Sequence, residues 1–169
     1  WGQLAQHVYA TAEPAIFGYD HPEGRLELRT ALARYLQRTR GVSCQPAQIL
    51  ILSGASQAFS LLNRLLLSPN DEMVIEDPMN YEVQVILSSS GAQLVPIPVD
   101  ERGMQTDLLP LATRPRCILV TPFHQFPMGV ILPIQRRLQL LQFARTADCY
   151  LVEDDYDSEF RYVGSPISS

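Results

Sequence analysis

Residues 117–152 read CILVTPFHQFPMGVILPIQRRLQLLQFARTADCYLV, and this stretch decides the fold class of the chain. Cys117–Val120 and Tyr150–Val152 are short apolar runs of the length typical of buried strands. Between them, Thr121–Gly129 is an irregular loop rich in proline and aromatic residues, and Ile134–Ala147 has the apolar spacing of a helix. Two strands joined through a helix pair in parallel in one sheet, so the stretch predicts an α/β fold.

The same alternation of strands and helices extends toward the N-terminus. A helix over residues 23–40 is predicted to end at Gly41. The other predicted elements are a strand at Ile49–Leu52, a helix through Ala58–Leu66, a strand at Met73–Ile75, a helix at Tyr81–Leu87, a strand at Leu94–Val99 and a short helix at Thr106–Leu111. Pro96 and Pro98 place the Leu94–Val99 strand at an edge. Residues 1–169 therefore predict one incomplete, three-layer α/β domain with a largely parallel sheet flanked by helices.

Composition excludes several classes of protein. The net charge is −5 and there is no basic cluster, which argues against a nucleic-acid surface on these residues. No run approaches the roughly 18 apolar residues of a membrane span, and no signal-peptide pattern opens the chain. The three cysteines form no Cys-x-x-Cys pair, as expected for reduced thiols. We expect a cytoplasmic protein without a membrane partner.

All 13 basic residues are arginine, so the chain has no lysine. A mechanism that needs a lysine amine, whether as a nucleophile or in a Schiff base, cannot be completed by these side chains.

Four unusual segments follow predicted strands. They are Ser53–Gln57, Glu76–Tyr81, Thr121–Gly129 and Glu153–Asp157. Because ligands bind where the carboxyl ends of parallel strands meet, the four segments predict a single site.

Ser53–Gln57 is a candidate anion cradle. A strand that ends in Ser-Gly and opens a helix through Ala-Ser presents free backbone N–H groups to a phosphate. A plain helix cap is the alternative. The segment also falls one residue short of a Gly-x-Ser-x-Gly nucleophile elbow, which leaves an α/β hydrolase open, with Ser56 as nucleophile and His124 as base.

The acidic residues after the last predicted strand allow three interpretations. They are Glu153, Asp154, Asp155, Asp157 and Glu159. Clustered carboxylates are able to hold Mg²⁺ or Ca²⁺, as in a metal-dependent enzyme, or form a solvated turn. Alternation along the strand sends Asp154 and Tyr156 to one face, where they are placed to meet the ring nitrogen and a ring oxygen of a cofactor.

Together the segments resemble the aminotransferase-like domain of MocR/PdxR-type regulators, a branch of the GntR transcription factors built on a fold type I, pyridoxal-phosphate-binding module. The resemblance covers residues 18–164. It rests on Ser53-Gly54-Ala55-Ser56-Gln57, Glu76-Asp77-Pro78, Thr121-Pro122, His124-Gln125-Phe126-Pro127 and Glu153-Asp154-Asp155-Tyr156-Asp157-Ser158-Glu159-Phe160. The last two motifs are specific to this branch.

The resemblance implies roles for individual residues. It places the cofactor phosphate at Ala55 and Ser56, the pyridine nitrogen at Asp154 and the phenolic ring oxygen at Tyr156. An ungapped match puts Asn80 where the family has the aromatic residue that stacks on the ring, and Tyr81, one residue later, is expected to supply it.

The resemblance also implies a function for a longer protein. The chain would be a truncated effector domain that binds pyridoxal 5′-phosphate, with an amine or amino acid as effector. The parent would be a homodimer, with a winged helix-turn-helix DNA-binding domain before residue 1 and the Schiff-base lysine after residue 169. The alternative is a fragment of a genuine class I/II aminotransferase. Phe126 stands where such enzymes use asparagine to bind the phenolic oxygen, which favours a sensor.

Overall fold

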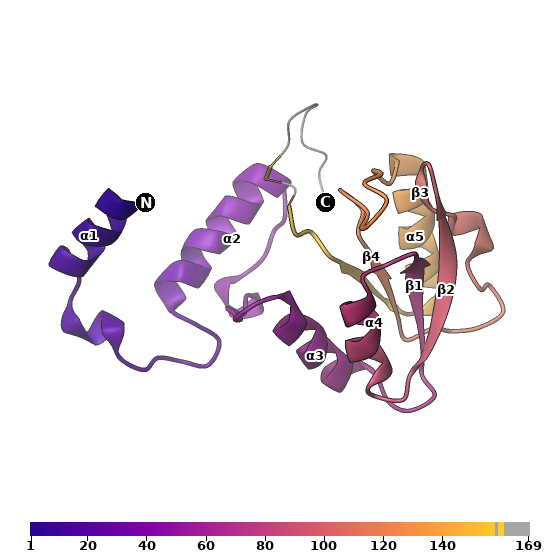
Figure 1. The fold of residues 1–169 in the computed structure, drawn as a ribbon, viewed down its shortest axis with the longest axis horizontal. Helices are drawn as coiled ribbons and strands as arrows, with labels where there is room; N and C mark the ends of the chain where they lie inside the picture. The colour runs from indigo at the N-terminus through magenta and orange to yellow at the C-terminus, as the bar shows by residue number, and fades with distance from the viewer. Residues whose placement is uncertain (158, 161–169) are drawn as a thin grey trace. The chain divides into compact units, whose positions relative to one another are not determined.

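The computed structural model describes residues 1–157, 159 and 160, and their elements are labelled in Figure 1. The described residues divide into two compact units, residues 1–52 and residues from Ser53 onward. The expectation of one domain over residues 1–169 stays a prediction. Within the part of the chain described, no helix combines the length and apolar character that a bilayer crossing requires.

The first unit consists of helices and extended loops. Its elements are α1 (Gly2–Thr11), the 3-10 helix η1 (Pro14–Phe17), α2 (Leu26–Arg40) and the 3-10 helix η2 (Pro46–Gln48). The predicted helix that ends at Gly41 is confirmed: α2 stops there because Gly41 adopts a left-handed conformation with φ of 70°. Arg29 binds this unit together, since its guanidinium donates to the carbonyls of Gly24 and Pro46 at 2.9 and 3.1 Å.

The predicted strand at Ile49–Leu52 is wrong. These residues belong to no strand, and the Ile51 amide donates to the Glu23 carbonyl at 2.9 Å. Ile51 packs locally: Gly24, at φ of +93°, lies so close that an added Cβ would meet the Ile51 side chain at 2.4 Å. Leu50 is exposed and the other three residues are only partly buried, so an apolar run of four residues does not by itself identify a sheet strand.

The second unit is built on a five-stranded sheet of order β3-β2-β1-β4-β5. Its strands are β1 (Glu72–Asp77), β2 (Gln93–Asp100), β3 (Gly103–Met104), β4 (Cys117–Val120) and β5 (Tyr150–Glu153). All neighbours pair in parallel except β2 and β3. The predicted strands that correspond to β1, β2, β4 and β5 are confirmed, as is the largely parallel sheet.

Strand β2 lies at the sheet edge along most of its length, as its prolines predict. β3 pairs only with its last two residues, through Val99 with Met104 and Asp100 with Gly103. Alternate residues of a strand turn their backbone groups to opposite neighbours. Pro96 and Pro98 are two residues apart, so the missing N–H groups fall on one side of β2.

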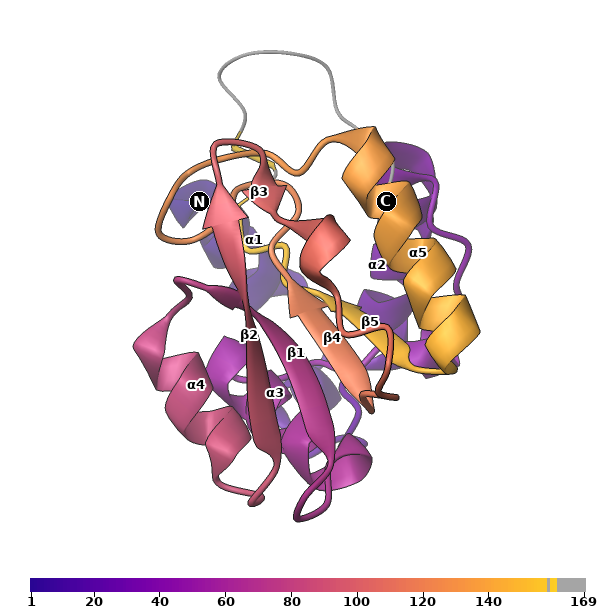
Figure 2. The same cartoon turned by 90° about the vertical axis from the view of Figure 1, so that its right-hand side faces the viewer.

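Helices cover both faces of this sheet, which confirms the three layers (Figure 2). The helices are α3 (Ala55–Leu66), α4 (Tyr81–Ser88) and α5 (Ile134–Ala147), with a 3-10 turn η3 at Thr106–Leu108 in place of the predicted helix Thr106–Leu111. Along β1, Met73 and Ile75 pack with α3 and α4, whereas Val74 packs with α5. Alternation along the strands therefore supplies two separate cores.

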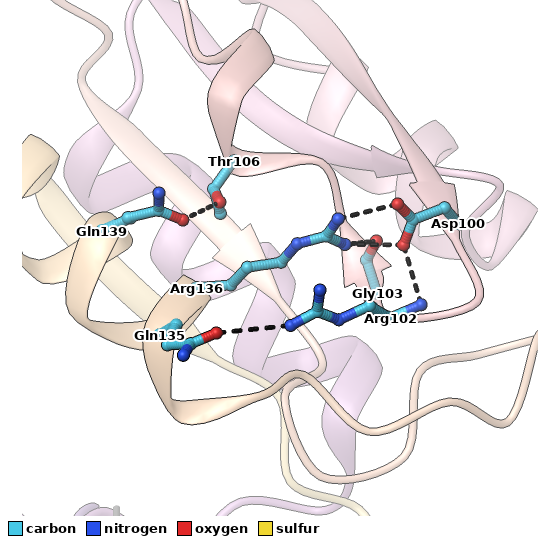
Figure 3. Close-up of polar contacts among 7 residues, drawn as sticks. All are labelled: Asp100, Arg102, Gly103, Thr106, Gln135, Arg136 and Gln139. Atoms are coloured by element: carbon cyan, nitrogen blue, oxygen red, sulfur yellow. Dashed lines mark hydrogen bonds and ion pairs between the residues drawn. The ribbon is translucent and has the colours of Figure 1, made fainter.

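A cluster of polar contacts ties the β2–β3 turn to α5 (Figure 3). Arg136 on α5 donates hydrogen bonds to both carboxylate oxygens of Asp100, at 2.6 and 2.7 Å, and to the Gly103 carbonyl at 2.8 Å. Hydrogen bonds from Arg136 hold the pKa of Asp100 at about 2. The cluster fixes the edge hairpin to the helix layer.

Candidate functional site

A pocket of about 290 Å³ lies where the C-terminal ends of β1, β4 and β5 meet the start of α3. Its lining residues are Ala55, Ser56, Phe59, Glu76, Met79, Asn80, Glu82, Val83, Leu119, Thr121, Phe126, Asp154 and Tyr156. Each of the four segments picked out in the sequence contributes to this pocket. The parallel sheet explains why the segments after β1, β4 and β5 gather, because these strands end at the same edge. Ser53–Gln57 follows no strand among the described residues and reaches the pocket through the start of α3.

The start of α3 supplies the anion-binding part of the pocket. The first intrahelical hydrogen bonds are donated by Gln57 and Ala58 to the Gly54 carbonyl, both at 3.2 Å. The amides of Ala55 and Ser56 precede them, at the positive end of the helix dipole. The Gln57 side chain turns back and accepts from the amide and hydroxyl of Ser53 at 2.7 and 2.8 Å. This bond fixes the loop that leads into the helix.

The residues after β5 supply an acid and a phenol. Asp154 continues the β4–β5 ladder, because its amide donates to the Val120 carbonyl at 2.9 Å. Partial burial raises the pKa of Asp154, and the negative charges of Asp155 and Asp157 raise it further. Tyr156, two residues on, also lines the pocket, as strand alternation predicts. Partial burial, followed by the charges of Asp157 and Asp154, raises the pKa of its phenol.

The loop Thr121–Gly129 closes another side of the pocket. Tyr156 donates from its hydroxyl to the His124 carbonyl at 2.8 Å and stacks on the His124 ring, with centroids 6.1 Å apart. The His124 ring in turn contacts the Asp157 carboxylate through Nδ1. Phe126 presents a half-exposed ring to the pocket. The residues after β5 and this loop are thus held to one another.

Asn80, and not Tyr81, lines the pocket. The Asn80 side chain caps α4 by accepting from the Glu82 amide at 2.8 Å. The Tyr81 side chain is 75% exposed at the start of the same helix. A role for Tyr81 against a bound ring stays a prediction.

Glu76 and the two residues that hold it received no individual role from the sequence. Glu76 ends the apolar run of β1 and is 2% exposed. Its Oε2 accepts from the Thr121 amide at 3.1 Å, from the Thr121 hydroxyl and from the Gln125 side-chain amide at 3.4 Å. Burial raises the pKa of Glu76. A carboxylate that directly follows a buried strand was the available sequence signal.

The hydrolase and metal interpretations find no support in the described residues. Among residues 1–157, 159 and 160, His124 pairs with Asp157 and no hydrogen bond joins it to Ser56. In the same part of the chain no three histidine, cysteine, aspartate or glutamate side chains are placed to hold a metal ion.

Comparison with known proteins assigns the chain to a family. The profile described as "Aminotransferase class I and II" matches residues 1–162, so the chain belongs to the class I and II aminotransferase family. A solved archaeal alanine:glyoxylate aminotransferase has a TM-score of 0.88 and 31% identity over 99% of this chain and 43% of its own.

Two curated regulators are also similar to the chain. "Probable rhizopine catabolism regulatory protein MocR" of Rhizobium meliloti is 37% identical over 99% of this chain and 34% of its own length. "HTH-type pyridoxine biosynthesis transcriptional regulator PdxR" of Corynebacterium glutamicum is 38% identical over 86% of this chain and 31% of its own length. The resemblance drawn from the motifs is confirmed. The chain spans about a third of the length of these regulators.

Proposed function

We propose that this chain binds pyridoxal 5′-phosphate without a covalent bond, as part of the aminotransferase-like effector domain of a GntR/MocR-type transcription regulator. The observation that carries the proposal is the pocket itself, which joins a helix N-terminus lined by Ala55 and Ser56 to the strand-end acid Asp154. An anionic phosphate and a protonated ring nitrogen need these two features within one cavity.

Two features of the pocket match the two ends of the cofactor. The free amides at the start of α3 suit the phosphate, and Asp154 suits a cationic ring nitrogen. Pyridoxal phosphate, when bound, supplies a ring that withdraws electrons from an attached amine. Asp154 favours the protonated ring, and Tyr156 lines the same pocket while its hydroxyl donates to the His124 carbonyl. Because the chain has no lysine, none of its side chains is able to hold the cofactor through a Schiff base.

A regulatory role is favoured over catalysis by the loop that borders the pocket. Phe126 lines the pocket with a ring that cannot donate a hydrogen bond. Both curated relatives described above are regulators by name, and one of them is named for pyridoxine biosynthesis. In the longer protein, cofactor or an amine effector would bias the conformation of a dimer and so of its attached DNA-binding domains.

A fragment of a true aminotransferase is the second candidate. The observation that favours it is the close superposition on a solved aminotransferase, with a TM-score of 0.88. Turnover of amino donors by the longer protein that carries a lysine would support this candidate, and binding without turnover would support the sensor.

Substitution at the start of α3 tests cofactor binding by the chain. Ser56→Glu places a negative charge against a bound phosphate and is expected to weaken pyridoxal phosphate affinity at least about tenfold. Ser60→Glu, one turn further along α3 and outside the pocket lining, is the matched control. Absorbance titration with pyridoxal phosphate measures the affinities of the two variants and of the unchanged chain. Equal affinities in all three would refute the assignment of the phosphate to the start of α3.

A further inference from the structure

A buried glutamine in the loop after β4 is not used by the proposed function. Gln125 is 1% exposed and directly precedes Phe126, which lines the pocket, but Gln125 is not itself among the described lining residues. Its backbone amide donates to the Val130 carbonyl at 2.9 Å, and its carbonyl accepts from the Gly129 amide at 2.6 Å. The loop thus holds the backbone of Gln125 at both its polar groups.

One nitrogen of the Gln125 side chain joins the loops that follow β1 and β4. Nε2 donates to the Pro78 carbonyl at 2.8 Å and to the Phe126 carbonyl at 2.9 Å. A side-chain amide nitrogen carries two hydrogens, and the two carbonyls use both of them. The contact of Nε2 with Glu76 Oε2 is longer, at 3.4 Å, and is the weakest of the three.

The oxygen of the same side chain fixes which way the amide group faces. Gln125 Oε1 accepts from the Met128 amide at 3.0 Å. A backbone N–H only donates, so its partner is the oxygen of Gln125, and the nitrogen is the atom that faces the two carbonyls. Both ends of the amide group are therefore used, and neither is exchangeable for the other.

Both loops that Gln125 joins supply walls of the pocket. Met79 and Asn80, which follow Pro78, line the pocket from the loop after β1. Phe126 lines it from the loop after β4. The backbone of both loops meets at Gln125 Nε2, so one side chain supports two walls of the pocket.

The anion-binding part of the pocket does not depend on this support. Ala55 and Ser56 line it from the start of α3. In the part of the chain that the structure describes, the hydrogen bonds of Gln125 go to the loops after β1 and β4 and to Glu76, and none goes to Ser53–Gln57. A change at Gln125 is therefore expected to alter the two walls without altering the start of α3.

We propose that Gln125 is a positioning residue of the pocket, which sets the space for the ring of a phosphorylated pyridine ligand by holding the loops after β1 and β4 to each other. The proposal rests on the proposed function, since it needs such a ligand in this pocket. Loops that are ordered before the ligand arrives cost less binding energy than loops that the ligand must order. Gln125 therefore contributes to affinity for the ring through Phe126, Met79 and Asn80.

Two ligands, one with a ring and one without, test the proposal. The probes are 4-deoxypyridoxine 5′-phosphate, which has the pyridine ring and the phosphate but no aldehyde, and inorganic phosphate. Gln125→Met keeps a side chain of similar length and removes its hydrogen bonds. We expect this variant to bind the ring probe at least about fivefold more weakly, and inorganic phosphate within about twofold of the unchanged chain. The Ser56 amide signal in nitrogen-15 NMR titrations follows the binding of both probes.

Gln139→Met is the matched control, since it makes the same change at a glutamine that accepts a hydrogen bond from Thr106 and lies outside the pocket lining. It is expected to bind both probes as the unchanged chain does. If Gln125→Met keeps its affinity for the ring probe, or loses affinity for both probes in the same proportion, the positioning role is overturned and the proposed function stands. Failure of the unchanged chain to bind the ring probe would instead overturn the proposed function, and the positioning role with it.

A second measurement needs no variant. In the unchanged chain, the NMR signals of the Gln125 side-chain amide are expected to shift when 4-deoxypyridoxine 5′-phosphate binds, because the loops that this amide joins contact the ring. Inorganic phosphate is expected to leave these signals in place. Side-chain amide signals of Gln125 that do not move with the ring probe would overturn the positioning role even if Gln125→Met does not fold.

Discussion

The hydroxyl of Tyr156 donates a hydrogen bond of 2.8 Å to the carbonyl of His124, and the two rings stack with centroids 6.1 Å apart. The contact joins segments that are 32 residues apart in the chain. It holds the loop after β4 against the residues after β5, so that both border one pocket.

Removing this hydroxyl is expected to loosen the pocket wall. Tyr156→Phe keeps the ring stacking but loses one hydrogen bond, and we expect it to lower the free energy of unfolding by about 0.5–1.5 kcal/mol. Urea denaturation measures the change, with Tyr150→Phe on β5 as the control. Equal losses of stability in the two variants would show that the His124 contact contributes nothing specific.

Asp154 and Asp157 are expected to respond differently to neutralisation. Asp154→Asn removes the charge proposed to bind the ring nitrogen and should lower affinity for 4-deoxypyridoxine 5′-phosphate at least about tenfold. Asp157→Asn should change it little, because Asp157 contacts His124 and is not part of the pocket lining. Binding titrations of the two variants give the comparison. A silent Asp154→Asn, together with Mg²⁺ or Ca²⁺ binding that falls on replacing Glu153, Asp155 or Asp157, would favour the metal-site interpretation.

Borohydride is expected to trap no cofactor on a side chain. A reducible linkage to pyridoxal phosphate needs a primary amine, and the chain has no lysine. Treatment of the mixture with borohydride followed by peptide mass mapping should find the N-terminal amine as the only modified position. A modified side chain would contradict the non-covalent proposal.

The Asp100–Arg136 ion pair is expected to stabilise the fold in a pH-dependent way. The Arg136 guanidinium lowers the pKa of Asp100 from 3.8 to about 2, so the carboxylate form of Asp100 is favoured in the folded state. The resulting stability is present above pH 3.8 and is lost as the pH falls toward about 2.

Asp100→Asn should abolish the loss of stability between pH 3.8 and about 2, whereas replacement of its exposed neighbour in Glu101→Gln should retain that loss. Urea denaturation midpoints of the unchanged chain and of the two variants, measured across this pH range, provide the test. A profile of Asp100→Asn parallel to that of the unchanged chain would show that the ion pair does not stabilise the folded state.

The local pattern of the sequence was sufficient to predict most elements of the second unit. The four-residue run Cys117–Val120 became β4 with its predicted bounds, and Ile134–Ala147 became α5. Both depend on interactions within a few residues and on burial of apolar side chains. Helix α1 and the 3-10 helices η1 and η2 were not predicted, and the apolar run Ile49–Leu52 was assigned to a sheet that it does not join.

By itself the sequence determined the α/β class, the ends of the strands at which a ligand would bind, and the absence of a lysine for covalent cofactor chemistry. These properties follow from periodicity and composition. Only the tertiary structure placed Asn80 in the pocket lining and Tyr81 outside it. Only the tertiary structure showed that Thr121 and Gln125 donate hydrogen bonds to the Glu76 carboxylate. The reason is physical: the partners of the buried Glu76 carboxylate lie 45 and 49 positions away along the chain, which no local pattern encodes.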